Sequence, residues 1–195
     1  MTCIIGMVDK ENDCVWMGAD SLGSNGFTKT IQEPPKVFKN KIFSNVVMGS
    51  TSTFRHIDLL KYSEDLFAEA DFYKNTDLSH EYMVTKFVPN IMKLFKEGLP
   101  SYDEKERGAN FLVGAKNKLF EIQCDYSVLQ PQTGFCSVGC GEYAAEASLF
   151  TTENMDIPVP ERITLALKAA ESCCCGVQRP FKIINTKDST EIIII

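Results

Sequence analysis

Residues 2–20 read TCIIGMVDKENDCVWMGAD, and this stretch decides the fold. Two largely apolar segments, Cys3–Val8 and Asp13–Gly18, flank the polar turn Asp9–Asn12. Both segments contain β-branched residues and are too short for helices of ordinary length. The sequence therefore predicts two strands joined by a turn, with the second strand ending next to Asp20.

Runs of strands and runs of helices follow one another along the rest of the chain. Further strands are predicted at Lys36–Phe38, Ile42–Met48, Phe111–Ala115, Lys118–Gln123, Phe135–Val138, Phe181–Asn185 and Glu191–Ile195. Helices are predicted after Gly49-Ser50 (with Phe54, Ile57, Leu60 and Phe67 at helical spacing), from Ser79 to Gly98 with a kink at Pro89, at Glu142–Phe150 and at Pro160–Cys174. Ser21–Pro35 predicts a long loop with a short strand near Phe27–Ile31. This order predicts one α+β layered domain over residues 1–195 and argues against a doubly wound parallel sheet.

The composition excludes several classes of protein. Of the 195 residues, 44% are hydrophobic and 24% are charged, and 20 Lys and Arg against 26 Asp and Glu give a net charge of −6. Because nucleic acids and anionic membranes attract basic surfaces, neither is expected as a partner. No apolar run approaches the ~20 residues that span a bilayer, and the first residues lack the basic region of a signal peptide. We therefore expect a cytoplasmic protein.

Thr2 is the first candidate for chemistry. Removal of Met1 would leave an amine and a hydroxyl on the same residue, which can serve as base and nucleophile. Asp20 and Lys36 lie at the ends of neighbouring predicted strands, where Asp20 would orient Lys36. Gly49, before a helix, could present a backbone N–H to an oxyanion.

These residues belong to a longer set of short motifs. The motifs are Thr2-Cys3-Ile4-Ile5-Gly6, Gly18-Ala19-Asp20-Ser21, Pro35-Lys36-Val37-Phe38, Met48-Gly49 and Val138-Gly139-Cys140-Gly141. Their order and approximate spacing resemble proteasome β-type subunits, above all bacterial HslV-type proteins. The resemblance implies an N-terminal nucleophile (Ntn) hydrolase fold, a four-layer αββα sandwich. It also implies hydrolysis of peptides or unfolded proteins within a homo-oligomeric ring, with an AAA+ ATPase as a possible partner.

The resemblance also assigns roles residue by residue. Thr2 matches the nucleophile, Asp20 and Lys36 the catalytic acid and lysine, and Gly49 the oxyanion glycine. Cys140 stands where the family has the serine of a Gly-Ser-Gly motif, and a thiol is a weaker hydrogen-bond partner than a hydroxyl. The stretch Glu171–Gly176 corresponds to the place where family members have either a supporting Asp/Ser pair or a loop that holds a monovalent cation. No other cofactor and no other metal is expected.

Other interpretations compete with this one. A catalytically inactive assembly or binding protein of the same fold is the main alternative, and Cys140 favours it. Eight cysteines also allow a thiol-based redox or metal protein, although the contiguous Cys173–Cys175 predict packed thiols rather than a zinc site. Gly139-x-Gly141-x-x-Ala144 resembles a dinucleotide fingerprint, but no strand ending in an acid follows about 20 residues later. A glycine turn that brings the following helix close to the active-site strand explains it better.

Overall fold

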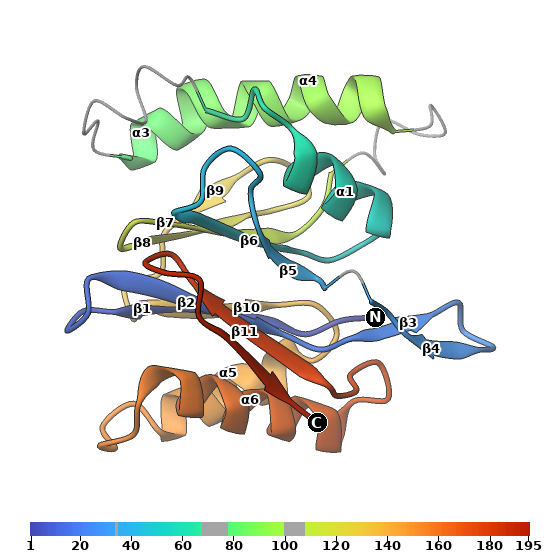
Figure 1. Cartoon of the computed structure of the whole chain (residues 1–195), viewed down its shortest axis with the longest axis vertical. Helices are drawn as coiled ribbons and strands as arrows, with labels where there is room; N and C mark the ends of the chain where they lie inside the picture. Colours follow the sequence, from blue (N-terminus) through green and yellow to red (C-terminus); the bar gives the residue numbers. More distant parts are fainter. Residues whose placement is uncertain (34, 68–77, 100–107) are drawn as a thin grey trace.

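The computed structural model describes residues 1–33, 35–67, 78–99 and 108–195. These residues form four layers, with two antiparallel sheets face to face and helices on each outer face (Figure 1). The first sheet has the strand order β10-β1-β2-β11-β12, and the second has the order β5-β6-β7-β8-β9. The predicted αββα sandwich is confirmed.

The strands of the first sheet are β1 (Ile4–Asp9), β2 (Cys14–Ala19), β10 (Phe135–Val138), β11 (Phe181–Asn185) and β12 (Glu191–Ile194). Those of the second are β5 (Val37–Lys39), β6 (Val46–Ser50), β7 (Phe111–Ala115), β8 (Lys118–Ile122) and β9 (Val128–Leu129). The helices α5 (Glu142–Thr151) and α6 (Val159–Cys173) cover the first sheet, while α1 (Phe54–Tyr62), α3 (His80–Tyr82) and α4 (Val88–Gly98) cover the second (Figure 1).

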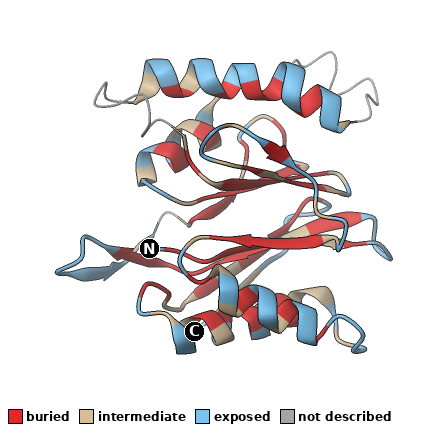
Figure 2. Cartoon of the chain, turned by 180° about the vertical axis from the view of Figure 1, so that it is seen from behind, coloured by how far each residue is buried: buried red, intermediate tan, exposed pale blue. Residues whose placement is uncertain are grey.

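The position of β1 explains why its apolar residues alternate so poorly with polar ones. Ile4 packs between the two sheets. Its neighbours Cys3 and Ile5 point the other way, into the layer beneath α5 and α6. A strand buried on both faces needs apolar residues at every position. The helices, in contrast, are buried only on the face toward the sheets (Figure 2).

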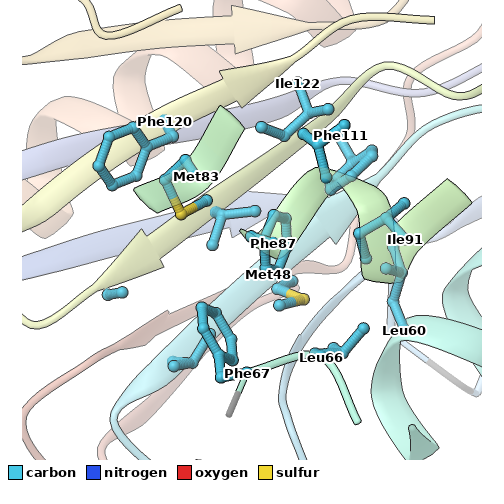
Figure 3. Packing of buried hydrophobic residues seen from close by; sticks show 14 of the residues in the cluster. Met48, Leu60, Leu66, Phe67, Met83, Phe87, Ile91, Phe111, Phe120 and Ile122 are labelled. Atoms are coloured by element: carbon cyan, nitrogen blue, oxygen red, sulfur yellow. The ribbon is translucent and has the colours of Figure 1, made fainter. Parts of the chain in front are cut away.

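Aromatic side chains fill the layer between the second sheet and its helices. Phe87 and Ile91 project from the helical layer toward Phe111 and Phe120 of the sheet (Figure 3). Burial of such large side chains is the main favourable contribution to folding. Phe67 also packs here, within 4.9 Å of Phe87 between ring centroids.

The structure corrects three details of the predicted elements. The short strand predicted within the loop is confirmed as β4 (Lys29–Ile31), but it pairs in a hairpin with a second strand that was not predicted, β3 (Leu22–Ser24). Helix α1 ends at Tyr62, so Phe67 reaches the core from outside the helix. A π-helical turn, Met83–Phe87, stands directly before α4, next to the proline for which a kink was predicted.

Among the described residues, no helix is long and apolar enough to cross a membrane.

Candidate active site

Three of the residues identified from the sequence lie at neighbouring strand ends. Thr2 precedes β1 and Asp20 follows β2, and because Ile4 pairs with Ala19 the two residues meet at one end of the first sheet. Lys36 precedes β5, the edge strand of the second sheet. Both sheets therefore contribute to one site. It lies near the N-terminus, beside the projecting β3–β4 hairpin (Figure 1).

Asp20 and Lys36 form a buried ion pair. Lys36 Nζ lies 2.9 Å from each carboxylate oxygen of Asp20, and the two side chains are 3% and 0% exposed. The carboxylate also accepts hydrogen bonds from the backbone N–H groups of Cys3 and Leu22, both at 2.9 Å. Burial lowers the pKa of Lys36, and the Asp20 charge opposes this shift. The ion pair is therefore buried and held by several hydrogen bonds.

Lys36 also faces the bond that precedes Thr2. Its Nζ donates to the Met1 carbonyl oxygen at 3.2 Å. The Thr2 hydroxyl donates to the same oxygen. Thr2 itself is only 6% exposed. The hydroxyl and the ammonium therefore converge on one carbonyl group at the mouth of the site.

The thiol of Cys140 contacts the backbone of Thr2. The Thr2 backbone N–H donates to Cys140 Sγ at 3.1 Å, and the thiol donates to the Thr2 carbonyl oxygen at 3.4 Å. Burial raises the pKa of the Cys140 thiol, which keeps it protonated near neutrality. Gly141 N–H also donates to the Thr2 carbonyl, at 3.3 Å. The turn at Gly139–Gly141 therefore holds the first residues of the chain, as expected of a glycine turn and not of a dinucleotide site.

The side-chain position of Gly49 faces away from this group, while the predicted role of its backbone N–H stays a prediction. It lies within β6, paired with Val37 on one side and Leu112 on the other. A Cβ atom at Gly49 would lie 2.5 Å from Ile4 Cγ2, so this position faces the packed space between the sheets. Close packing accounts for the glycine.

The wall of the site next to Thr2 is formed instead by the residues that follow Gly49. A pocket of about 250 Å³ is lined by Thr2, Lys36, the strand Leu22–Ser24, the polar run Ser50–Thr53 and Phe54. Sequence reasoning missed this run, although its signal was present: four consecutive Ser and Thr residues directly after a buried strand.

The segment after α6 supplies a second missed residue. Cys174 is the C-terminal capping residue of this helix, and Gly176, two residues later, lies against Cys140: a Cβ atom on Gly176 would be 2.6 Å from Cys140 Sγ. Cys173 and Cys175 are exposed and Cys174 is only partly buried, so the prediction that the three thiols fill the core is wrong. Contiguous residues point in different directions, and only the middle one faces the protein.

Glu171 and Arg179 form an ion pair across the segment that follows α6. Arg179 makes side-chain hydrogen bonds of 2.6 and 2.9 Å to Glu171 Oε2, and its backbone N–H donates to Glu171 Oε1 at 2.8 Å. These bonds lower the pKa of Glu171. The backbone carbonyl oxygen of Gln178, the residue before Arg179, accepts a hydrogen bond from the N–H of Ser21, the residue after Asp20. The Glu171–Arg179 ion pair therefore helps to hold the loop after α6 next to the buried carboxylate of Asp20.

Within the described ranges, no group of three or more His, Cys, Asp or Glu side chains is arranged to hold a metal ion. The monovalent cation expected near Glu171–Gly176 stays a prediction.

Comparison with known proteins supports the fold through structure and not through sequence. No protein-family model matches the chain, and no curated protein sequence is significantly similar to it.

Solved structures superpose closely on nearly the whole chain. BPH from Thiobacillus denitrificans, in complex with epoxomicin, has a TM-score of 0.73 at 14% identity, covering 94% of this chain and 97% of that one. Eukaryotic HslV from Trypanosoma brucei has a TM-score of 0.68 at 19% identity, covering 94% and 98%. Anbu, described as an ancestral β-subunit, from Yersinia bercovieri has a TM-score of 0.69 at 10% identity, covering 100% and 86%. The chain has the fold of proteasome-type Ntn hydrolases.

Proposed function

We propose that this chain, built on the proteasome-type Ntn hydrolase fold, is a threonine-type peptidase. Thr2 would act as the nucleophile once Met1 has been removed. One observation carries the proposal: Thr2 lies between a buried Asp20–Lys36 pair and the Cys140 thiol. An N-terminal threonine in such surroundings has a hydroxyl, an amine and a fixed positive charge together.

The proposed reaction begins with attack of Thr2 Oγ on the substrate carbonyl carbon. The Thr2 α-amine accepts the hydroxyl proton, directly or through a water molecule, and Lys36 stabilises the negative charge that develops. Collapse of the tetrahedral species breaks the peptide C–N bond, and the proton passes to the leaving amine. Water then hydrolyses the ester on Thr2 and restores the free hydroxyl. Cys140, which contacts the Thr2 nitrogen, holds the amine in place.

We assign the oxyanion to the backbone of Ser50 in place of Gly49. Ser50 lines the pocket with Thr2 and Lys36. Its N–H donates to the Lys36 carbonyl oxygen at 3.4 Å, a long hydrogen bond. A developing oxyanion competes well for such a weakly held donor.

We further propose peptides or unfolded proteins as substrates, a homo-oligomeric ring as the active assembly and an AAA+ ATPase as a partner that feeds it. These proposals follow from the resemblance of the motifs to proteasome β-type subunits. A sizing measurement that returned a monomer at micromolar concentration would contradict the ring.

The decisive experiment is an intact mass spectrum before and after incubation with epoxomicin, an α′,β′-epoxyketone. This reagent closes a ring on a hydroxyl and a free amine of the same terminal residue. We expect loss of Met1 and a single adduct on Thr2. Thr2→Ser keeps both groups and should still be labelled, whereas Thr2→Ala keeps only the amine and should not be. An assembled protein with a free Thr2 that never reacts would contradict the proposal.

The alternative is a non-catalytic protein of the same fold that serves in assembly or binding. Cys140 favours it, because sulfur is a poorer hydrogen-bond partner than a hydroxyl oxygen. Retention of Met1 in the purified protein would favour this alternative as well.

A further inference from the structure

Two lysines point into the space between the two sheets. Lys39 ends β5, the edge strand of the second sheet, and its side chain faces the same way as that of Val37, two residues earlier. Lys182 lies in β11 of the first sheet and likewise faces the same way as Ile184. Val37 and Ile184 both belong to the apolar core between the sheets. Charged groups at the border of such a core are costly unless a group of opposite charge lies beside them.

A cavity of about 310 Å³ lies at this border, between β5 and the hairpin of β11 and β12. Apolar side chains of both sheets form part of its lining, among them Val37 and Ile184. The polar lining consists of three half-buried lysines, two hydroxyl groups and one carboxylate: Lys39, Lys61, Lys182, Ser189, Thr190 and Glu191. Three positive charges therefore surround the cavity against one negative charge, in a chain whose net charge is −6.

Among the described residues, the ammonium group of Lys39 forms no ion pair with a carboxylate. Its Nζ donates to the backbone carbonyl oxygen of Asp188. The Asp188 carboxylate accepts hydrogen bonds from the Asn185 side chain and from Thr190 N–H instead. Burial lowers the pKa of Lys39, although the Asp188 charge opposes this shift. An anion in the cavity would supply the charge that Lys39 lacks.

Lys182 also keeps donors for a ligand. Its Nζ pairs with Glu191 Oε1 at 2.6 Å, and its side chain is 25% exposed. Because an ammonium group carries three N–H bonds, neither Lys39 nor Lys182 has used all of its donors. The hydroxyl groups of Ser189 and Thr190 line the same cavity and can donate as well.

We propose that this cavity is a binding site for a phosphate group, carried either by inorganic phosphate or by a small phosphate ester. Near neutral pH such a group carries close to two negative charges and at least three acceptor oxygens, which match several ammonium and hydroxyl donors at once. A carboxylate offers one charge and two oxygens, and so satisfies fewer of them. The bound group bridges the edges of the two sheets. The site lies outside the pocket next to Thr2 and is independent of the proposed function.

The test is isothermal titration calorimetry of the whole chain with inorganic phosphate, at an ionic strength held constant with sodium chloride. We expect saturable binding of one phosphate per chain, together with a higher urea midpoint in phosphate than in chloride. Lys39→Met removes one charged hydrogen bond and should weaken binding about tenfold. Lys41→Met is the matched control, because Lys41 pairs with Glu64 and does not line the cavity.

A second variant should strengthen binding. Glu191→Gln removes the carboxylate that lines the cavity and frees the Lys182 ammonium group from its ion pair. We expect it to bind inorganic phosphate about threefold more tightly. Damage to the fold does not produce tighter binding, so this variant tests the proposal even if Lys39→Met folds poorly.

Phenyl phosphate distinguishes the two sources of the phosphate group. Tighter binding of phenyl phosphate than of inorganic phosphate would support a phosphate ester whose organic part lies on Val37 and Ile184, whereas equal binding would support free phosphate. The inference is overturned if phosphate gives no binding beyond that of chloride, or if acetate binds as tightly as phosphate. It also fails if Lys41→Met weakens binding as much as Lys39→Met, or if Glu191→Gln binds phosphate less tightly than the unchanged protein.

Discussion

Gly139 lies so close to Thr2 that a Cβ atom on it would be 2.3 Å from the Thr2 carbonyl oxygen. Its φ of +106° is also a conformation that side chains disfavour. The turn that carries Cys140 therefore depends on a glycine for two reasons, its own conformation and its contact with the first residues of the chain.

Gly139→Ala is expected to displace Thr2 and abolish epoxomicin labelling. Gly134→Ala is the matched control, because Gly134 also has a positive φ, +79°, but the nearest atom to its Cβ would be 3.7 Å away. The control should lose about 1 kcal/mol of stability from backbone strain alone and keep its labelling. Equal labelling of the two variants would show that the contact with Thr2 is unimportant.

Lys36→Met is expected to reduce the free energy of unfolding by about 3 kcal/mol, because it leaves the Asp20 carboxylate buried without its counter-charge. The double variant Asp20→Asn/Lys36→Met should recover part of that loss. Lys41→Met breaks an exposed pair with Glu64 at 3.8 Å and should cost less than about 1 kcal/mol. Urea unfolding measures all three, and equal losses for Lys36→Met and Lys41→Met would refute the prediction.

Cys140→Ser is expected to accelerate labelling of Thr2. A serine hydroxyl forms stronger hydrogen bonds with the Thr2 nitrogen and carbonyl than the thiol does. A gain of about 1 kcal/mol in transition-state stabilisation corresponds to a rate about fivefold higher. Cys124→Ser, a change of an exposed cysteine, serves as the control. Slower labelling of Cys140→Ser would mean that the surroundings of Thr2 are adapted to sulfur.

The stability contributed by Glu171 is expected to depend on pH. Hydrogen bonds from Arg179 lower the pKa of Glu171 in the folded protein. Its contribution is therefore complete above the unfolded value of about 4.3 and is lost as the pH falls through the lower folded value. Glu171→Gln should cost up to about 1 kcal/mol at pH near 7 and much less at strongly acidic pH.

Urea unfolding of Glu171→Gln and of the unchanged protein across this range measures the difference. Glu64→Gln is the control for loss of an exposed acid. A cost for Glu171→Gln that stays constant as the pH falls would exclude the ionised carboxylate as its source.

Much of this protein could be predicted from its sequence because the relevant signals are local. The pattern of residues 2–20 predicts the hairpin of β1 and β2 within one residue at each end. The order of runs of strands and runs of helices along the chain predicts an α+β domain built in layers. Thr2 is a candidate because removal of Met1 would place an amine and a hydroxyl on it, and Asp20 and Lys36 are candidates because each stands at the end of a predicted strand. The single domain, the cytoplasmic location and the ring stay predictions.

Only the tertiary structure decided which residues complete the site. Whether Gly49 or Ser50 faces the pocket depends on the register of β6, and a shift of one residue exchanges the core face for the other face. The close approach of Gly176 to Cys140 depends on how the loop after α6 packs against the turn after β10. Local patterns carry no information about such contacts, because they arise from the packing of elements that are far apart in the chain.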